Sequence, residues 1–161
     1  MEISRKVWER YKNRMAAVDQ KAVDQMEAYI SQIGGYEGHA DEVIRYAYAL
    51  VTKYGEASAA AACEMYEAVA EASGKYVPAA EPADTPEYGE VAKAINGTVK
   101  NSSEKRIPST VGRLVKRTGA DTMLKNAGRD GAQFAWIPVG DTCPFCIMLA
   151  SRGCSICLRT L

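Results

Sequence analysis

Residues 41–73 read DEVIRYAYALVTKYGEASAAAACEMYEAVAEAS, and this stretch decides the fold. Its apolar positions recur in steps of three and four, as at Ile44, Ala47 and Val51, so they share one stripe of a helix. Asp41 is predicted to be the N-cap. The small residues ASAAAAC in the middle predict that a partner backbone can approach closely. Because the helix is apolar on one stripe only, it must bury that stripe against another element.

The stretch before it, from about residue 4 to residue 33, has the same rhythm. Its apolar positions are Trp8, Tyr11, Met15, Val18, Ala22, Met26, Tyr29 and Ile33. Gly34-Gly35 is predicted to end this helix, because glycine adopts the positive φ that a helix C-terminus often needs. Two long helices joined by a short glycine turn form an antiparallel pair, so residues 1–74 are predicted to be a helical hairpin.

The rest of the chain divides into three parts. Residues 75–86 contain three prolines and no periodicity, which indicates a linker or a surface loop. Residues 87–131 are predicted to be a shorter basic helical region. Residues 132–161 are predicted to be a small unit with a strand at 134–139 followed by a cysteine knuckle.

The basic helical region is expected to hold one or two helices. Thr85-Pro86 has the pattern of an N-cap followed by proline at the first helical position, and the Asn-Gly pair at 96–97 is expected to end that helix. Residues 98–107 are polar and expected to be exposed. A second helix is expected to begin after Pro108.

Charge is distributed unevenly along a chain of 161 residues whose formal net charge is zero. Residues 37–92 carry eleven acidic and three basic residues, whereas residues 93–130 carry nine basic and three acidic residues. One interpretation is two solvated faces that partly neutralise each other. The other is a basic segment that faces nucleic acid or an acidic protein surface. Under the second interpretation, the contacting side chains are predicted to be Lys105, Arg106, Arg113, Lys116 and Arg117.

The sequence contains no long apolar run, so no transmembrane helix is predicted. The charged N-terminal stretch lacks the apolar centre of a signal peptide, and the protein is therefore expected to be made in a reducing cytoplasm. In such a compartment, paired cysteines are more often metal ligands or redox groups than disulfides.

Four of the five cysteines form two Cys-x-x-Cys pairs near the C-terminus: Cys143, Cys146, Cys154 and Cys157. Three interpretations stay open. The four thiolates could hold one tetrahedral zinc ion, the only cofactor that the sequence suggests. The first pair could be a redox site that follows a strand, as in thioredoxin-like proteins. The thiols could also be free, and Cys63, inside the alanine run, is predicted to be a small packing residue.

The stretch PVGDTCPFCIMLASRG, Pro138 to Gly153, resembles the signature of tailed-phage minor capsid proteins, which are portal-associated head proteins related to the Mu F-type head morphogenesis group. The matching residues are Cys143, Cys146, Met148, Leu149, Ala150, Ser151, Arg152 and Gly153. The resemblance implies a virion structural protein of low copy number near the portal, and not an enzyme. It also implies a continuation beyond Leu161 that would supply further metal ligands.

We therefore expect a mainly α protein with a long antiparallel hairpin, one or two shorter helices and a small C-terminal strand and cysteine unit. The expected partners are portal and capsid proteins, DNA, and a second copy of the chain through the hairpin. The alternative functions are a zinc-dependent nucleic-acid-binding module and, less favoured, a thiol oxidoreductase. The one histidine, His39, lies just before residues 41–73 and about a hundred residues from the paired cysteines, so a loop or capping role is expected for it and no Ser-His-Asp or Cys-His arrangement is predicted.

Overall fold

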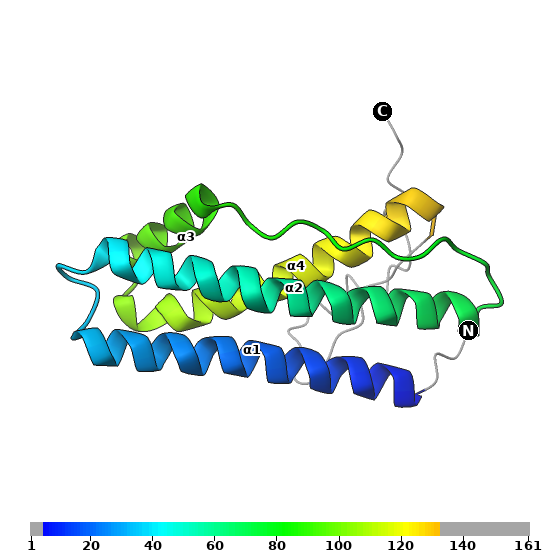
Figure 1. Cartoon of the computed structure of the whole chain (residues 1–161), viewed down its shortest axis with the longest axis horizontal. Helices are drawn as coiled ribbons and strands as arrows, with labels where there is room; N and C mark the ends of the chain where they lie inside the picture. Colours follow the sequence, from blue (N-terminus) through cyan, green and yellow to red (C-terminus); the bar gives the residue numbers. More distant parts are fainter. Residues whose placement is uncertain (1–4, 133–161) are drawn as a thin grey trace.

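The computed structural model describes residues 5–132, and within them the chain is mainly helical (Figure 1). Four α-helices and one short 3₁₀ turn follow each other along these residues. They are α1 (Arg5–Ile33), α2 (Ala40–Ala72), α3 (Tyr88–Asn101), η1 (Glu104–Arg106) and α4 (Ile107–Asp130). Helices α2 and α4 each pack against the other three α-helices, so these two form the centre of the described part of the chain.

Helices α1 and α2 form the predicted antiparallel hairpin, and they lie side by side along most of their length (Figure 1). The turn begins at the predicted glycines, since Gly34 and Gly35 have φ of 88° and 111°. The amide of Gly35 donates to the carbonyl of Ile30 at 3.0 Å, which closes the end of α1. The N-cap of α2 is His39 and not Asp41 as predicted; Asp41 lies in the first turn, where its charge favours the positive end of the helix dipole.

Helix α4 makes the closest approach to the small-residue part of α2. A Cβ added at Gly119 would lie 2.5 Å from Ser58 Oγ and 3.3 Å from the Ser58 carbonyl oxygen. A Cβ added at Gly55 would lie 3.2 Å from Thr118 Oγ1. The close approach predicted from ASAAAAC therefore exists, but the helix that approaches is α4.

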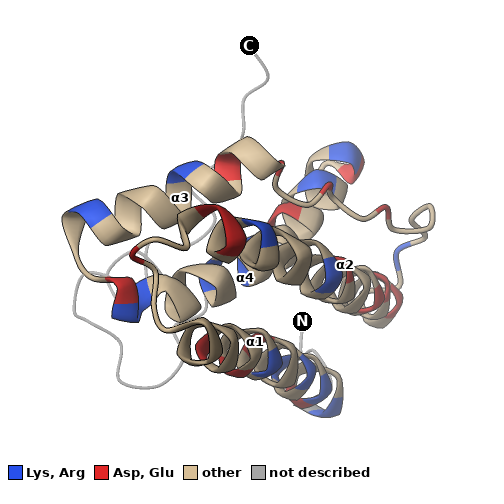
Figure 2. Cartoon of the chain, turned by 60° about the vertical axis from the view of Figure 1, so that its left-hand side comes forward, with Lys and Arg blue, Asp and Glu red and all other residues tan. Residues whose placement is uncertain are grey.

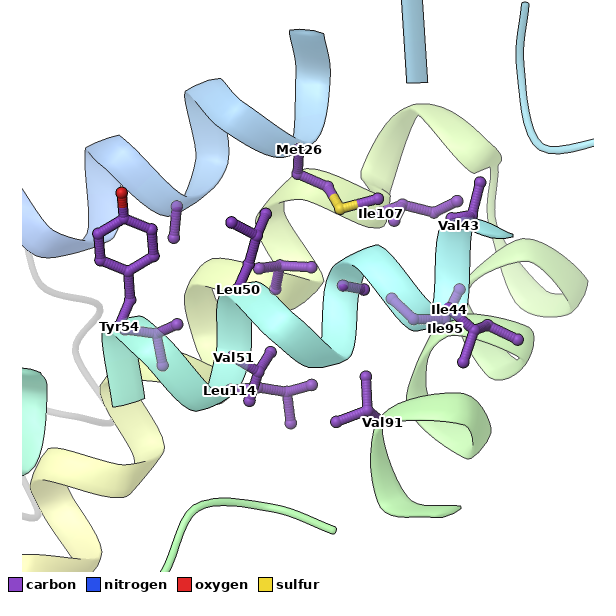
Figure 3. Packing of buried hydrophobic residues seen from close by; sticks show 14 residues of the cluster. Met26, Val43, Ile44, Leu50, Val51, Tyr54, Val91, Ile95, Ile107 and Leu114 are labelled. Atoms are coloured by element: carbon purple, nitrogen blue, oxygen red, sulfur yellow. The ribbon is translucent and has the colours of Figure 1, made fainter. Parts of the chain in front are cut away.

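The hydrophobic core draws on all four α-helices (Figure 3). Its buried members are Ala22, Met26, Val43, Ile44, Ala47, Leu50, Val51, Tyr54, Val91, Ile95, Ile107, Val111, Leu114 and Val115. The side chains of Met26, Leu50 and Ile107 meet where α1, α2 and α4 converge (Figure 3). Removing such side chains from water is the main favourable contribution to folding, at roughly 1.5–3 kcal/mol for each large one.

Helix α3 differs from its prediction at both ends. It begins after Glu87, which forms a capping box with Glu90, so Thr85-Pro86 is not its start. It continues through the Asn-Gly pair at 96–97 to Asn101, and within its last turn Thr98 Oγ1 pairs with Thr110 Oγ1 of α4 at 2.7 Å. Residues 98–107 hold the last turn of α3, η1 and the first residue of α4; most of them are exposed, as predicted, but Ile107 is fully buried.

We call residues 75–87 the strap. It has no regular secondary structure and runs as an extended segment along α2 and α4 to the start of α3 (Figure 1). Thr85 of the strap packs on Gly55 of α2, because a Cβ at that glycine would lie 3.0 Å from Thr85 Cγ2. The sequence prediction of a loop agrees with this segment, which side chains of α2 and α4 contact between Pro78 and Thr85.

The predicted C-terminal strand and cysteine knuckle lie outside the described residues. Within residues 5–132, no helix is both long enough and apolar enough to cross a lipid bilayer.

Candidate functional site

The five basic residues predicted to contact a partner lie on η1 and on the N-terminal half of α4, and all five are exposed. The 3₁₀ turn η1 contacts both α3 and α4, so Lys105 and Arg106 lie where the end of α3 meets the start of α4. Figure 2 shows Lys and Arg at the far end of α3 and at the turn below it. The five predicted residues are therefore spread from η1 to the middle of α4, and their surroundings differ.

Lys116 and Arg117 are engaged within the molecule. Lys116 Nζ lies 3.0 Å from Asp19 Oδ2 of α1. Arg117 Nε lies 3.4 Å from Asp121 Oδ2, and its Nη1 lies 3.8 Å from Glu90 Oε1 of α3. These pairs partly neutralise the two cations and turn them toward the helices on either side of α4.

Lys105, Arg106 and Arg113 have no ion-pair partner among the described residues. The nearby acid, Glu104, faces the hairpin turn, where its Oε2 accepts a hydrogen bond from the Tyr36 amide at 2.9 Å. This bond leaves Lys105 and Arg106, the other two residues of η1, exposed to solvent.

A shallow hollow of about 290 Å³ lies beside η1, where α1 meets the start of α4. Its lining residues are Glu27, Ile30, Ser31, Glu104, Lys105 and Pro108. Two carboxylates therefore share this hollow with Lys105, so the electrostatic field around Lys105 is mixed. Arg106 and Arg113 do not line this hollow.

A second polar cluster, which sequence reasoning missed, fastens the strap to α4. The side chain of Asn126 is almost fully buried: Oδ1 accepts from the Glu81 amide at 2.9 Å, and Nδ2 donates to the Glu81 carbonyl at 2.8 Å. Thr122 Oγ1 accepts from the Ala83 amide at 3.0 Å, and the Arg129 guanidinium donates to the carbonyls of Ala79 and Pro78. The one sequence signal was the spacing of Thr122, Asn126 and Arg129 by four and three residues, which puts them on one stripe.

We call the cluster of Thr122, Asn126, Arg129, Asp130 and Tyr66 the clasp. The pKa shifts of its residues are those expected of a structural feature. The hydrogen bond between Arg129 and Asp130 lowers the pKa of Asp130 and raises the pKa of Arg129. Burial, followed by a hydrogen bond to Asp130 at 2.8 Å, raises the pKa of Tyr66 to about 12. Every shift moves away from neutral pH, whereas a general acid or base needs a pKa near the working pH. The cluster therefore holds fixed charges and supports the attachment of the strap.

The four cysteines proposed as zinc ligands, Cys143, Cys146, Cys154 and Cys157, lie outside the described residues. Cys63 is a partly buried free thiol on α2, and burial raises its pKa, which disfavours the reactive thiolate. Among residues 5–132, no group of three or more His, Cys, Asp or Glu side chains is placed to hold a metal ion.

Comparison with known proteins gives a match to a protein family. A family model described as VG15 protein matches residues 2–156, which is nearly the whole chain and includes Cys143, Cys146 and Cys154. The curated proteins give no match, and neither do the solved structures.

Proposed function

Because the chain belongs to the VG15 protein family, a family of phage proteins, we propose that it is a structural component of the virion. In this role it is a minor capsid or head morphogenesis protein that lies near the portal. The observation that carries the proposal is the extent of the family match, which includes the stretch from Pro138 to Gly153 that resembles the minor capsid signature. The proposed role is structural and involves no catalytic step.

The form of the helical bundle supports a role in assembly. Helix α1 has 29 residues, but only Ala22 and Met26 of its described side chains are buried. Most of its surface therefore faces solvent and is free to contact portal or capsid subunits. The α1–α2 hairpin is also the surface through which two copies of the chain would associate.

Mass spectrometry of purified phage particles tests the proposal directly. We expect the chain in the particles at a small fraction of the copy number of the major capsid protein. Cross-linking of intact particles is expected to join lysines of α1, such as Lys12 or Lys21, to a portal or capsid subunit. Finding the chain in infected cells but not in purified particles would contradict the proposal.

A further inference from the structure

We propose that the end of the molecule formed by α3, η1 and the start of α4 binds the phosphate backbone of duplex DNA. We call the surface of Lys100, Lys105, Arg106 and Arg113 the basic face. This inference deepens the proposed function and rests on it, because a component of a phage head is placed where it can meet packaged DNA.

The first support is an excess of basic over acidic residues in this part of the chain, which ion pairs within the fold do not neutralise. Residues 93–113 contain five basic residues and one acidic residue, Glu104. The carboxylate of Glu104 is bonded to the Tyr36 amide at the hairpin turn. The four side chains of the basic face are exposed, and none has an ion-pair partner among residues 5–132. Lys105 shares its hollow with Glu27 and Glu104, and the positive charges of Lys100, Arg106 and Arg113 face solvent without an ion pair among these residues.

The second support is the arrangement of the two arginines. Arg106 is the N-cap of α4, and Arg113 lies seven residues further along, close to two helical turns, so the two lie on the same side of the N-terminal part of α4. At 1.5 Å per residue they are separated by about 10 Å along the axis. One strand of B-DNA carries a phosphate every 3.4 Å of its axis, so both guanidinium groups can reach phosphates of one strand about three nucleotides apart. The positive end of the α4 dipole lies beside Arg106 and adds to the attraction.

The third support separates DNA from an acidic protein as the partner. The centre of a protein–protein interface is usually apolar and rich in aromatic residues. The large hydrophobic side chains that are exposed in residues 5–132 are Tyr76, Tyr88 and Leu124, and they lie on the strap, at the start of α3 and in the C-terminal half of α4. None of them belongs to the basic face. Phosphate contacts come instead from Arg and Lys, which is what this face presents.

Two double variants of the full chain test the proposal because they remove the same charge from different places. Arg106→Gln/Arg113→Gln removes two unpaired cations from the basic face. Lys116→Gln/Arg117→Gln removes two cations that are paired with acids of the chain. Binding to a fluorescent 30-base-pair duplex is measured by anisotropy at several salt concentrations. Thermal unfolding of each variant, followed by circular dichroism, checks that the bundle is intact.

We expect the wild-type chain to bind the duplex with an affinity that falls as salt rises. Arg106→Gln/Arg113→Gln is expected to weaken binding about tenfold at 0.1 M salt and to reduce the slope of log K against log salt by about 2, since each phosphate contact contributes about 0.9. Lys116→Gln/Arg117→Gln is expected to change the affinity by about twofold or less.

Other outcomes overturn the assignment. If both double variants weaken binding equally, the attraction depends on total charge and not on the basic face. If the wild-type chain does not bind the duplex at low salt, the DNA proposal is wrong. Loss of the Arg106→Gln/Arg113→Gln variant from particles would then identify an acidic protein as the partner of this face. Presence of the wild-type chain in particles is scored separately, so the virion proposal can stand when the DNA proposal fails, and the reverse.

Discussion

Gly119 lies where α4 comes closest to α2, and its missing side chain makes that distance possible. An added methyl group would meet the hydroxyl and the carbonyl of Ser58 and would lie 3.2 Å from Met15 Cε of α1. We predict that Gly119→Ala destabilises the protein by about 1 kcal/mol: overpacking costs about 1–3 kcal/mol, and the better helix propensity of alanine returns up to about 1 kcal/mol. Urea unfolding followed by circular dichroism measures the change.

Gly128 is the matched control because it lies on the same helix and an added Cβ there meets nothing within 4 Å. Gly128→Ala is expected to stabilise the protein by up to about 1 kcal/mol through helix propensity alone. Equal effects of the two substitutions would show that α4 can move away from α2 without cost, and the close contact would then have no energetic importance.

Asp130 gives the clasp a dependence on pH. Its pKa is lowered in the folded protein by Arg129, so its contribution to stability is present above the ordinary carboxyl pKa and is lost as the pH falls through the lowered value. We predict that the wild type melts at a higher temperature than Asp130→Asn between pH 5 and pH 9. The difference is expected to shrink below about pH 4. Thermal melts over this range measure it.

The contribution of Tyr66 to stability depends on pH in the opposite direction, because it is lost when the pH rises. Its pKa is raised to about 12, so the stability that its protonated hydroxyl contributes is complete below the ordinary value of about 10 and is lost between these two values. The advantage of the wild type over Tyr66→Phe should therefore persist at pH 9 and decline above pH 10. If the difference in stability between the wild type and Tyr66→Phe does not vary with pH, the hydrogen bond between Tyr66 and Asp130 does not contribute to stability as proposed.

At the scale of elements, the strap depends on a few side chains of α4. The carboxamide of Asn126 pairs with both backbone groups of Glu81, and Thr122 holds the Ala83 amide. We predict that Asn126→Ala releases the middle of the strap and lowers the free energy of unfolding by about 2–3 kcal/mol, because buried backbone groups lose their partners. Hydrogen exchange measured by mass spectrometry is expected to show lost protection at Glu81.

Asn101 at the exposed end of α3 is the control for this substitution. Asn101→Ala is expected to leave exchange in the strap unchanged and to alter stability by less than about 0.5 kcal/mol. If Asn126→Ala also leaves the Glu81 amide protected, the strap is held mainly by the contact of Thr85 with Gly55.

The elements also show how far the sequence determined the prediction. The three-four rhythm identified α1 and α2 because their buried positions are apolar, and the glycine pair marked the turn between them. Helix α3 was predicted too short because an Asn-Gly pair often ends a helix, whereas here the helix continues past it to Asn101, and its Thr98 side chain bonds to Thr110 of α4. Helix α4 was predicted, but not as a core element, because its buried stripe includes Thr118, Gly119 and Thr122, which do not read as apolar.

At the scale of the whole molecule, the sequence again predicts what lies within one segment and not what depends on contacts between helices, and the basic face is an example. The sequence correctly grouped its bases in one segment, since a count of charges along the chain needs no coordinates. It could not separate Arg106 and Arg113 from Lys116 and Arg117, because the acids that pair with the latter include Asp19 of α1 and Glu90 of α3. Pairing across helices is a property of the fold.

The hydrophobic core also determines what a metal could contribute to the whole molecule. Its members lie between Ala22 and Val115, and none of them is a cysteine. We therefore predict that a zinc chelator added to the purified full chain leaves the helical circular dichroism signal and the melting temperature of the bundle unchanged. Elemental analysis of the same sample reports separately whether Cys143, Cys146, Cys154 and Cys157 hold zinc. A bundle that unfolds on chelation, as zinc-dependent domains do, would favour the zinc-binding nucleic-acid module over the scaffold.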